Sequence, residues 1–215
     1  MKAFGRKTII AAAAIASLGG IAVAAAPAQA ASPAATAQHQ TVAPEALSAS
    51  QLAALPLTNR HLDRHEIKNL AVVLGAYHDA QGDSLNVNAF VNSFTKNGVF
   101  NDMVAGKTYQ GQALGDVLTN MVDIFPDVHR TLYTINVTEN EISIELAIQG
   151  TFLKPAQTPA GTLKPNGAKI NAPTADFWYL NNDSKITKFD CFVGYTDMYA
   201  QMGVNLDWAG AVAAS

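Results

Sequence analysis

The stretch EISIELAIQGTF, from Glu141 to Phe152, indicates the kind of structure to expect in the second half of the chain. Two sets of residues alternate along it: Ile142, Ile144, Leu146 and Ile148 against Ser143, Glu145, Ala147 and Gln149. An apolar period of two is typical of a β-strand that buries one face and leaves the other wetter. The sequence therefore predicts a half-buried strand over this stretch.

The same period continues on both sides of that stretch. HRTLYTINV (129–137) precedes it, and AKINAPTADFWYL (168–180) and KITKFDCFVGYTD (185–197) follow, with the polar turn NNDS between them. The connection KPAQTPAGTLKPNG (154–167) is long and interrupted by Pro and Gly, and whether it acts as a lid stays open. This half of the chain is predicted to be a run of strands linked by hairpins.

Upstream, the apolar period is three to four, which indicates helices. Asp63 followed by Glu66 resembles a capping box, and Gly82 is positioned to end the helix that starts there. The apolar positions expected to face the core from this helix are Ile67, Leu70, Ala71, Leu74 and Tyr77.

Two more helices are expected before the strands begin. One has an apolar stripe of Val87, Phe90, Val91 and Phe94, and a short strand over Val99–Val104 follows it. The other keeps its period from Leu114 until Pro126 stops it. Three helices followed by strands linked by hairpins predict an α+β fold, an antiparallel sheet with helices on one face.

Several short motifs resemble, in their order and spacing, the SnoaL-like family of the nuclear transport factor 2-like superfamily. The resemblance covers almost all of 66–205, and its motifs are GD (82–83), FVNSFTKNGVFND (90–102), YQG (109–111), FPDVH (125–129), GTF (150–152), PNG (165–167), DFWYL (176–180), KITKF (185–189) and YTDMYAQMGV (195–204). It implies a curved antiparallel sheet wrapped around the three N-terminal helices, which forms a cone with an apolar pocket that opens at one end. That fold hosts isomerases, cyclases, dehydratases and pure binding modules, so it does not choose a function.

Asp176 stands in TADFWYL, which otherwise reads as a buried strand, although strands avoid Asp. From the residues alone, it either faces water or is a buried carboxylate that must be paired or neutralised. The resemblance implies the second alternative, because SnoaL-like cyclases carry an acid/base Asp at this position. Ketosteroid isomerase-like members keep an Asp here protonated so that it donates a hydrogen bond.

Asp102 is the second candidate carboxylate. It lies eight residues after Phe94, the spacing at which the isomerases carry their base, so the resemblance implies a base and a donor in Asp102 and Asp176. The sequence departs from the isomerases at Gly75, where their oxyanion Tyr would fall, and Tyr77 lies on a different face of the helix.

His129 begins a predicted strand, where it either carries protons near neutral pH or lies at the rim or surface. Phe152 replaces the His of a GTH motif found in many relatives, which makes the expected interior drier. Aromatic residues supply candidate walls for a ligand, although core packing would require them too. The expected ligand-binding residues are Tyr77, Phe100, Phe152, Trp178 and Phe192.

Other classes of site have little support in the sequence. His61 and His65 are spaced i and i+4, but no Glu motif accompanies them, so no metal is expected. There is no Gly-rich phosphate loop, and no cofactor is expected. The chain has 14 basic and 17 acidic residues without a basic cluster, which argues against nucleic acid as a partner.

The amino terminus has the layout of a signal peptide. Residues 1–30 combine a basic start, an apolar run and the small-residue ending Ala28-Gln29-Ala30, so cleavage is expected after Ala30. Removing Lys2, Arg6 and Lys7 leaves 11 basic and 17 acidic residues, a net charge of −6. A periplasmic or secreted protein without a membrane contact after cleavage is predicted.

The remaining organisation follows from composition. Residues 31–60 are rich in Ala, Ser and Pro and read as a flexible tether with one short helix near EALSASQLAAL. Residues 61–208 are expected to form the domain and 209–215 a tail.

The predicted function is binding of a small, largely apolar carbonyl or ring compound in the cone. Cofactor-free isomerisation, cyclisation or dehydration through Asp176 is the enzymatic version. The alternative is a non-catalytic binding module or a homodimer that pairs through its sheet face.

Overall fold

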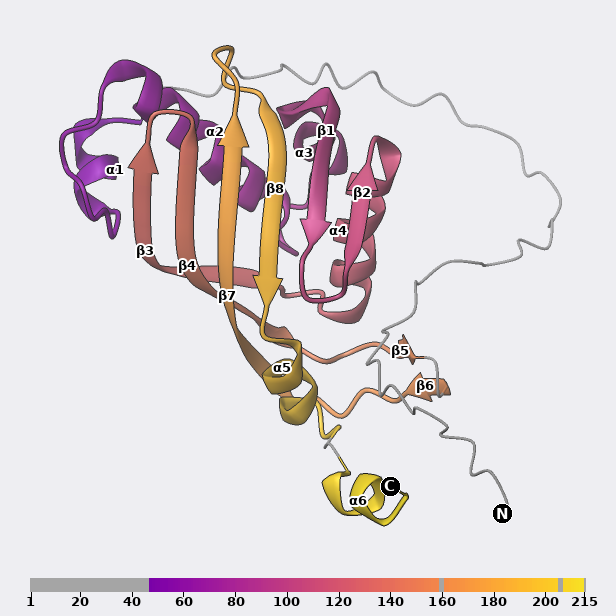
Figure 1. Cartoon of the computed structure of the whole chain (residues 1–215). Coiled ribbons are helices and arrows are strands. Elements are labelled where there is room, and N and C mark those ends of the chain that lie inside the picture. Colours follow the sequence, from indigo (N-terminus) through magenta and orange to yellow (C-terminus); the bar gives the residue numbers. More distant parts are fainter. Residues whose placement is uncertain (1–46, 159–160, 205–206, 215) are drawn as a thin grey trace, which may run out of the picture.

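The computed structural model describes residues 47–158, 161–204 and 207–214, so the predicted signal peptide and most of the tether lie outside the described residues. Helices pack on one face of a large curved sheet that does not close, which confirms the predicted α+β cone (Figure 1). The helices are α1 (Ala49–Ala54), α2 (Arg64–Asp79), α3 (Val87–Ser93), α4 (Gln112–Ile124), α5 (Tyr195–Gln201) and α6 (Trp208–Ala214).

Six strands form the main sheet in the order β2-β1-β8-β7-β4-β3, and two more form a separate hairpin. Their bounds are β1 (Phe94–Asp102), β2 (Lys107–Gln110), β3 (His129–Thr138), β4 (Glu141–Thr151), β5 (Ala156–Thr158), β6 (Gly161–Leu163), β7 (Lys169–Leu180) and β8 (Ile186–Val193). All pairs in the sheet are antiparallel except β1 with β8, which is parallel. The predicted alternation of β4 is confirmed, because Ile142, Ile144, Leu146 and Ile148 are all buried.

The first core helix begins as the sequence predicts. The Asp63 carboxylate accepts the backbone N–H groups of His65 and Glu66, and the Glu66 side chain accepts the N–H of Asp63, which completes a capping box. The helix ends at Asp79, three residues before Gly82. Gly82 instead permits close packing, because a Cβ there would lie 1.9 Å from the Pro126 carbonyl oxygen.

The second helix is shorter and the next strand longer than expected. Phe94, predicted as the last residue of the helical stripe, is extended (φ −84°, ψ 156°) and starts β1. Phe90 and Phe94 are both buried with ring centroids 5.2 Å apart, so burial alone does not distinguish the two conformations. The predicted strand over Val99–Val104 is thus the second half of β1, and it ends at Asp102.

The segment assigned to the end of the tether is attached to the sheet. Leu57 forms a parallel bridge with Ile135 of β3, and the Thr58 N–H donates to the Ile135 carbonyl at 2.9 Å. The Asn59 amide donates to the Val137 carbonyl at 2.8 Å. This segment therefore covers part of the exposed edge of β3.

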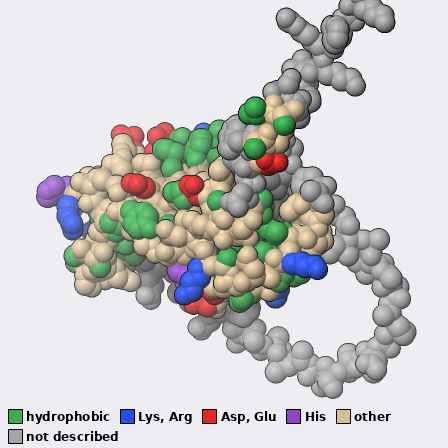
Figure 2. All heavy atoms as spheres, turned by 90° about the horizontal axis from the view of Figure 1, so that it is seen from below, with side chains coloured by type: hydrophobic (Ala, Val, Ile, Leu, Met, Phe, Trp, Pro, Cys, Tyr) green, Lys and Arg blue, Asp and Glu red, His purple; other side chains and the backbone are tan. Residues whose placement is uncertain are grey.

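The lower end of the sheet in Figure 1 carries α5 and the β5–β6 hairpin, and α6 lies beyond them. Seen from that end, hydrophobic side chains form separate groups between polar surface (Figure 2). The outer face of the sheet exposes Tyr133, Phe177 and Phe192, and the last two rings meet edge to face. Among the residues that the structure describes, no helix is both long and apolar enough to cross a membrane.

Candidate functional site

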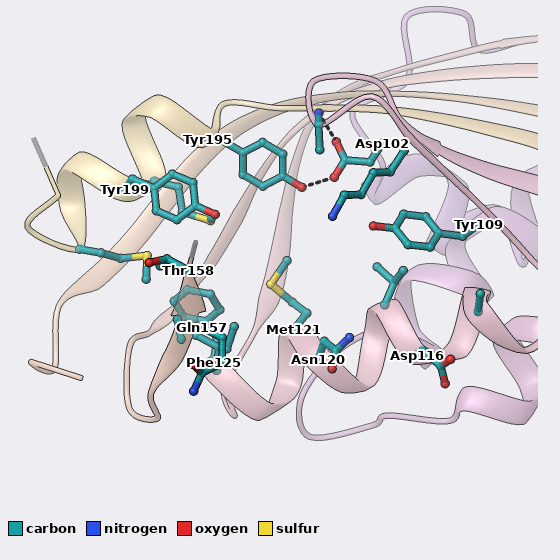
Figure 3. Close-up of a pocket in the computed structure, with 18 residues that line it drawn as sticks. Asp102, Tyr109, Asp116, Asn120, Met121, Phe125, Gln157, Thr158, Tyr195 and Tyr199 are labelled. Carbon is teal, nitrogen blue, oxygen red and sulfur yellow. Dashed lines mark hydrogen bonds between the residues drawn. The ribbon is translucent and has the colours of Figure 1, made fainter. Parts of the chain in front are cut away.

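A cavity of about 350 Å³ opens at the lower end of the cone, between α4, the β1–β2 turn, β5 and α5 (Figure 3). One set of lining side chains is apolar: Val117, Met121, Ile124, Phe125, Met198 and Met202. A second set is polar: Asp102, Lys107, Tyr109, Asn120, Tyr195 and Tyr199. Three of the five methionines of the chain therefore face this cavity, where their flexible thioethers adapt to varied shapes.

Asp102 is the predicted catalytic residue that the structure places in this cavity. It is the last residue of β1 and is 7% exposed. The Tyr195 hydroxyl donates to its Oδ2 and the Ala105 backbone N–H donates to its Oδ1 at 3.0 Å. Burial and then the charge of Asp102 raise the pKa of Tyr195 well above its usual range, so this phenol stays protonated and remains a donor.

Two further phenols flank this pair. The hydroxyls of Tyr109 in β2 and Tyr199 in α5 face the cavity from either side of Tyr195 (Figure 3). Burial and then the charge of Asp102 raise the pKa of both phenols. Within the described part of the chain, neither hydroxyl has a hydrogen-bond partner. The cavity thus contains a buried carboxylate and two phenol donors that are unsatisfied by the protein.

Asp176 lies in the middle of β7, 2% exposed, and does not line the cavity. Its Oδ2 accepts the Tyr77 hydroxyl at 2.7 Å, and the Trp178 indole N–H donates to the same Tyr77 oxygen at 3.0 Å. Its Oδ1 meets no donor at hydrogen-bond geometry among the described residues. Asp176 is therefore a sealed carboxylate in the packed interior.

Burial raises the pKa of the Asp176 carboxyl to about 6. The neighbouring Cys191 thiol, the Tyr77 hydroxyl and the positive charge of Arg130 act in the opposite direction. The Arg130 guanidinium lies 5.5 Å from the centre of the Tyr77 ring and donates to the Ala80 carbonyl at 3.0 Å. Asp176 is consequently poised to change its protonation state in the mildly acidic range.

The two predicted carboxylates stand in one row of the sheet. Cys191 of β8 is the register partner of Asp102 on one side and of Asp176 on the other. Neighbouring strands lie about 4.8 Å apart, which puts the two Asp Cα atoms roughly 10 Å from each other. All three side chains are buried, so the row joins the cavity to the sealed interior through the thiol.

His129 is exposed at the start of β3, where its Nδ1 lies 2.9 Å from the Asp127 carbonyl oxygen. It does not line the cavity. His65, one of the two His considered as metal ligands, contacts the Asn140 side chain at 2.7 Å. Of the three predicted catalytic residues, the structure therefore brings only Asp102 to the cavity.

The five predicted ligand-binding aromatics also lie outside the lining of the cavity. Four are buried in the core, where Trp178 stacks on Phe189 with ring centroids 3.6 Å apart. Phe192 is 40% exposed on the outer face of the sheet, because it follows Cys191 and successive strand residues point to opposite faces. The four buried side chains are Tyr77, Phe100, Phe152 and Trp178.

The helix α5 is not among the elements predicted from the sequence, although the sequence holds a signal for it. Tyr195, Met198, Tyr199 and Met202 recur at i, i+3, i+4 and i+7, the spacing of one helical face. All four line the cavity. Helical periodicity after the last strand thus predicts a helix that closes the open end of the cone.

Comparison with known proteins bears on the fold. No protein-family model matches the chain, and no curated protein matches its sequence. Solved structures match. A protein from Jannaschia sp. CCS1 described as a SnoaL-like polyketide cyclase has a TM-score of 0.56 at 14% identity and covers 66% of this chain and 99% of its own. A Bacillus cereus protein described as a polyketide cyclase has a TM-score of 0.56 at 17% identity, covering 70% and 91%.

A third similar structure is a Catenulispora acidiphila protein with a ketosteroid isomerase-like fold, crystallised in complex with trimethylamine. Its TM-score is 0.50 at 20% identity, and the match covers 63% of this chain and 95% of that one. At these identities the likeness concerns the fold. The chain has the cone fold of SnoaL-like and ketosteroid isomerase-like proteins, that of the nuclear transport factor 2-like superfamily.

Proposed function

We propose that this protein binds a small, largely apolar molecule in the cavity, with the polar end of the ligand at Asp102 and Tyr195. The observation that carries the proposal is the buried Asp102 carboxylate, which faces the cavity with only neutral donors bonded to it. A concave, mostly apolar site with a few convergent polar groups is typical of small-molecule binding. The cavity volume of about 350 Å³ also falls within the range of such sites, roughly 300–1,000 Å³.

Acid/base catalysis is a second candidate, and the Asp102–Tyr195 contact favours it. Proton abstraction next to a carbonyl needs a base on one side and hydrogen-bond donors at the oxygen. Asp102 would be the base, and Tyr109 or Tyr199 would donate to the developing oxyanion. Cofactor-free isomerisation, cyclisation or dehydration fits these groups. A direct catalytic role of Asp176 stays a prediction that would require the Tyr77 seal to open.

Pairing of two copies through the sheet face is an alternative that stays a prediction, supported by the exposed Tyr133, Phe177 and Phe192. Export to the periplasm or medium is likewise proposed from residues 1–30. Mass spectrometry of the mature protein would test export, because cleavage after Ala30 leaves Ala31 at the amino terminus.

Methyl NMR of the full chain with labelled methionines tests ligand binding directly. A neutral bicyclic compound should shift the methyl signals of Met121, Met198 and Met202, which line the cavity. Met103 is 44% exposed and lies outside the lining, so it serves as an internal reference. Ala113→Phe, which adds a ring to the cavity wall, should abolish the shifts. Equal shifts at all four methyls, or none, would refute the proposal.

A further inference from the structure

We propose that the group anchoring the ligand is a hydroxyl, so that the ligand class is ring-bearing alcohols and phenols. This inference rests on the proposed function of the cavity. The hydroxyl would donate to Asp102, and its oxygen would accept from Tyr109 or Tyr199. The cavity volume of about 350 Å³ equals that of roughly a dozen water molecules at about 30 Å³ each. A bicyclic ring compound is therefore of a suitable size.

Asp102 is the acceptor for the hydroxyl of the ligand. An ionised carboxylate has about four lone-pair sites, and Asp102 uses one on each oxygen, for Ala105 and for Tyr195. Asp102 is 7% exposed and lines the cavity. A ligand that donates a hydrogen bond therefore finds a desolvated, charged acceptor, and such bonds are stronger than those between neutral groups.

The flanking phenols are the donors to the hydroxyl oxygen of the ligand. Tyr109 and Tyr199 stay protonated because burial and the charge of Asp102 both raise their pKa. Their hydroxyls face the cavity without a partner among the described residues (Figure 3). Because neither hydroxyl is bonded by the described part of the protein, a ligand oxygen can accept from either phenol without displacing a protein contact.

Only some chemical groups can donate to the Asp102 carboxylate and also accept from a phenol. A hydroxyl has one donor and two acceptor lone pairs, which match one carboxylate acceptor and a phenol donor. A ketone or ether accepts but cannot donate to Asp102. An ammonium donates but cannot accept from a phenol, and a ligand carboxylate is repelled by Asp102.

Lys107 provides the competing possibility. It is the register partner of Asp102 across β1 and β2, and it lines the same cavity. No carboxylate in the described part of the chain lies within 4 Å of its ammonium, so it is available to attract an anionic ligand. The test must therefore separate a hydroxyl from a carboxylate.

Four probes that share one ring system make this separation in the full chain: 2-naphthol, 2-methoxynaphthalene, 2-acetylnaphthalene and 2-naphthoate. Calorimetry at neutral pH should give a Kd for naphthol at least about tenfold lower than for the methoxy and acetyl compounds, because only naphthol makes the charge-assisted bond. Asp102→Asn should reduce the ratio between the Kd values of the methoxy and acetyl compounds and the Kd of naphthol. One of Tyr109→Phe and Tyr199→Phe should weaken naphthol binding by about tenfold, whereas Tyr133→Phe on the outer face should leave it unchanged.

The outcomes separate the two proposals. Equal Kd values for naphthol and the two non-donating probes overturn the hydroxyl inference while the cavity remains a ligand site. Tightest binding of naphthoate overturns it in favour of Lys107. Binding of none of the four probes, with no shift of the cavity methionine methyls, overturns both this inference and the proposed function.

Discussion

Asp176 and Asp102 lie in the same row of the sheet, yet their surroundings give them different chemistry. Tyr77 and Trp178 seal Asp176 within the core, and burial raises its pKa to about 6. Asp102 borders the cavity and is bonded by Tyr195. Asp176 can therefore be tested through the pH dependence of stability, and Asp102 through the strength of its contact with Tyr195.

The Asp176 carboxyl should make stability fall as pH rises. Its pKa is about 6 in the folded protein against 3.8 for the free group, so the folded state holds the extra proton between these values. Ionisation of the buried group should remove about 2 kcal/mol of unfolding free energy between pH 4 and pH 7. Urea denaturation of the wild type and of Asp176→Asn across this range checks it. The stability of the variant relative to the wild type should rise with pH, and a constant difference would contradict the shift.

Tyr195→Phe should destabilise the fold by about 1–3 kcal/mol, because it leaves a buried carboxylate short of a donor. Tyr199→Phe is the matched control, since its ring stacks on Tyr195 but its hydroxyl has no partner in the described part of the chain. Equilibrium unfolding in urea compares the two. Similar losses for both variants would mean that the Tyr195–Asp102 bond contributes little.

At the scale of single elements, two glycines of the α2 region have opposite roles. Gly75 lies inside α2, and a Cβ there would meet nothing within 4 Å. Gly82 follows the helix, donates its N–H to the Val128 carbonyl at 2.8 Å and packs against the Pro126 backbone. The first is a weak point of a helix, and the second packs against the 126–128 segment that leads into β3.

Gly75→Ala should stabilise the protein by up to about 1 kcal/mol through helix propensity. Gly82→Ala should destabilise it by about 1–3 kcal/mol or more, because a Cβ 1.9 Å from the Pro126 oxygen forces the backbone apart. Thermal denaturation of both variants gives the comparison. A loss of stability in Gly75→Ala, or tolerance of Gly82→Ala, would contradict these assignments.

For the whole molecule, the segment before α2 completes the sheet. Leu57, Thr58 and Asn59 pair with β3 and cover part of an edge strand. Unpaired strand edges promote association between copies of a chain. The attachment of this segment is therefore expected to protect the sheet as well as to position α1.

A protein that starts at residue 61 should have a lower melting temperature and associate more with concentration than one that starts at residue 47. The shorter chain loses the hydrogen bonds to Ile135 and Val137. Calorimetry combined with sedimentation velocity checks both effects. Identical melting temperatures for the two chains would show that the segment is dispensable.

The sequence predicted the architecture better than the site. Local patterns were sufficient for the strand at Glu141–Thr151 and the cap at Asp63, because each depends on residues close in the chain. Phe94 was assigned to a helix because its burial fits either conformation. The seal over Asp176 depends on Tyr77, which is 99 residues away, and no local pattern reveals such a contact.

The parallel pairing of β1 with β8 sets the order in which the fold can be completed. β8 lies between β1 and β7, so without it the sheet divides into the β1–β2 pair and the β7–β4–β3 set. Because the chain is synthesised from its amino terminus, β1 cannot pair with β8 until residues 186–193 have been made. Such distant pairing slows folding, and it delays completion of the six-stranded sheet until synthesis is nearly finished. Under the export proposed for residues 1–30, that delay would let a translocation channel thread the chain before the cone closes.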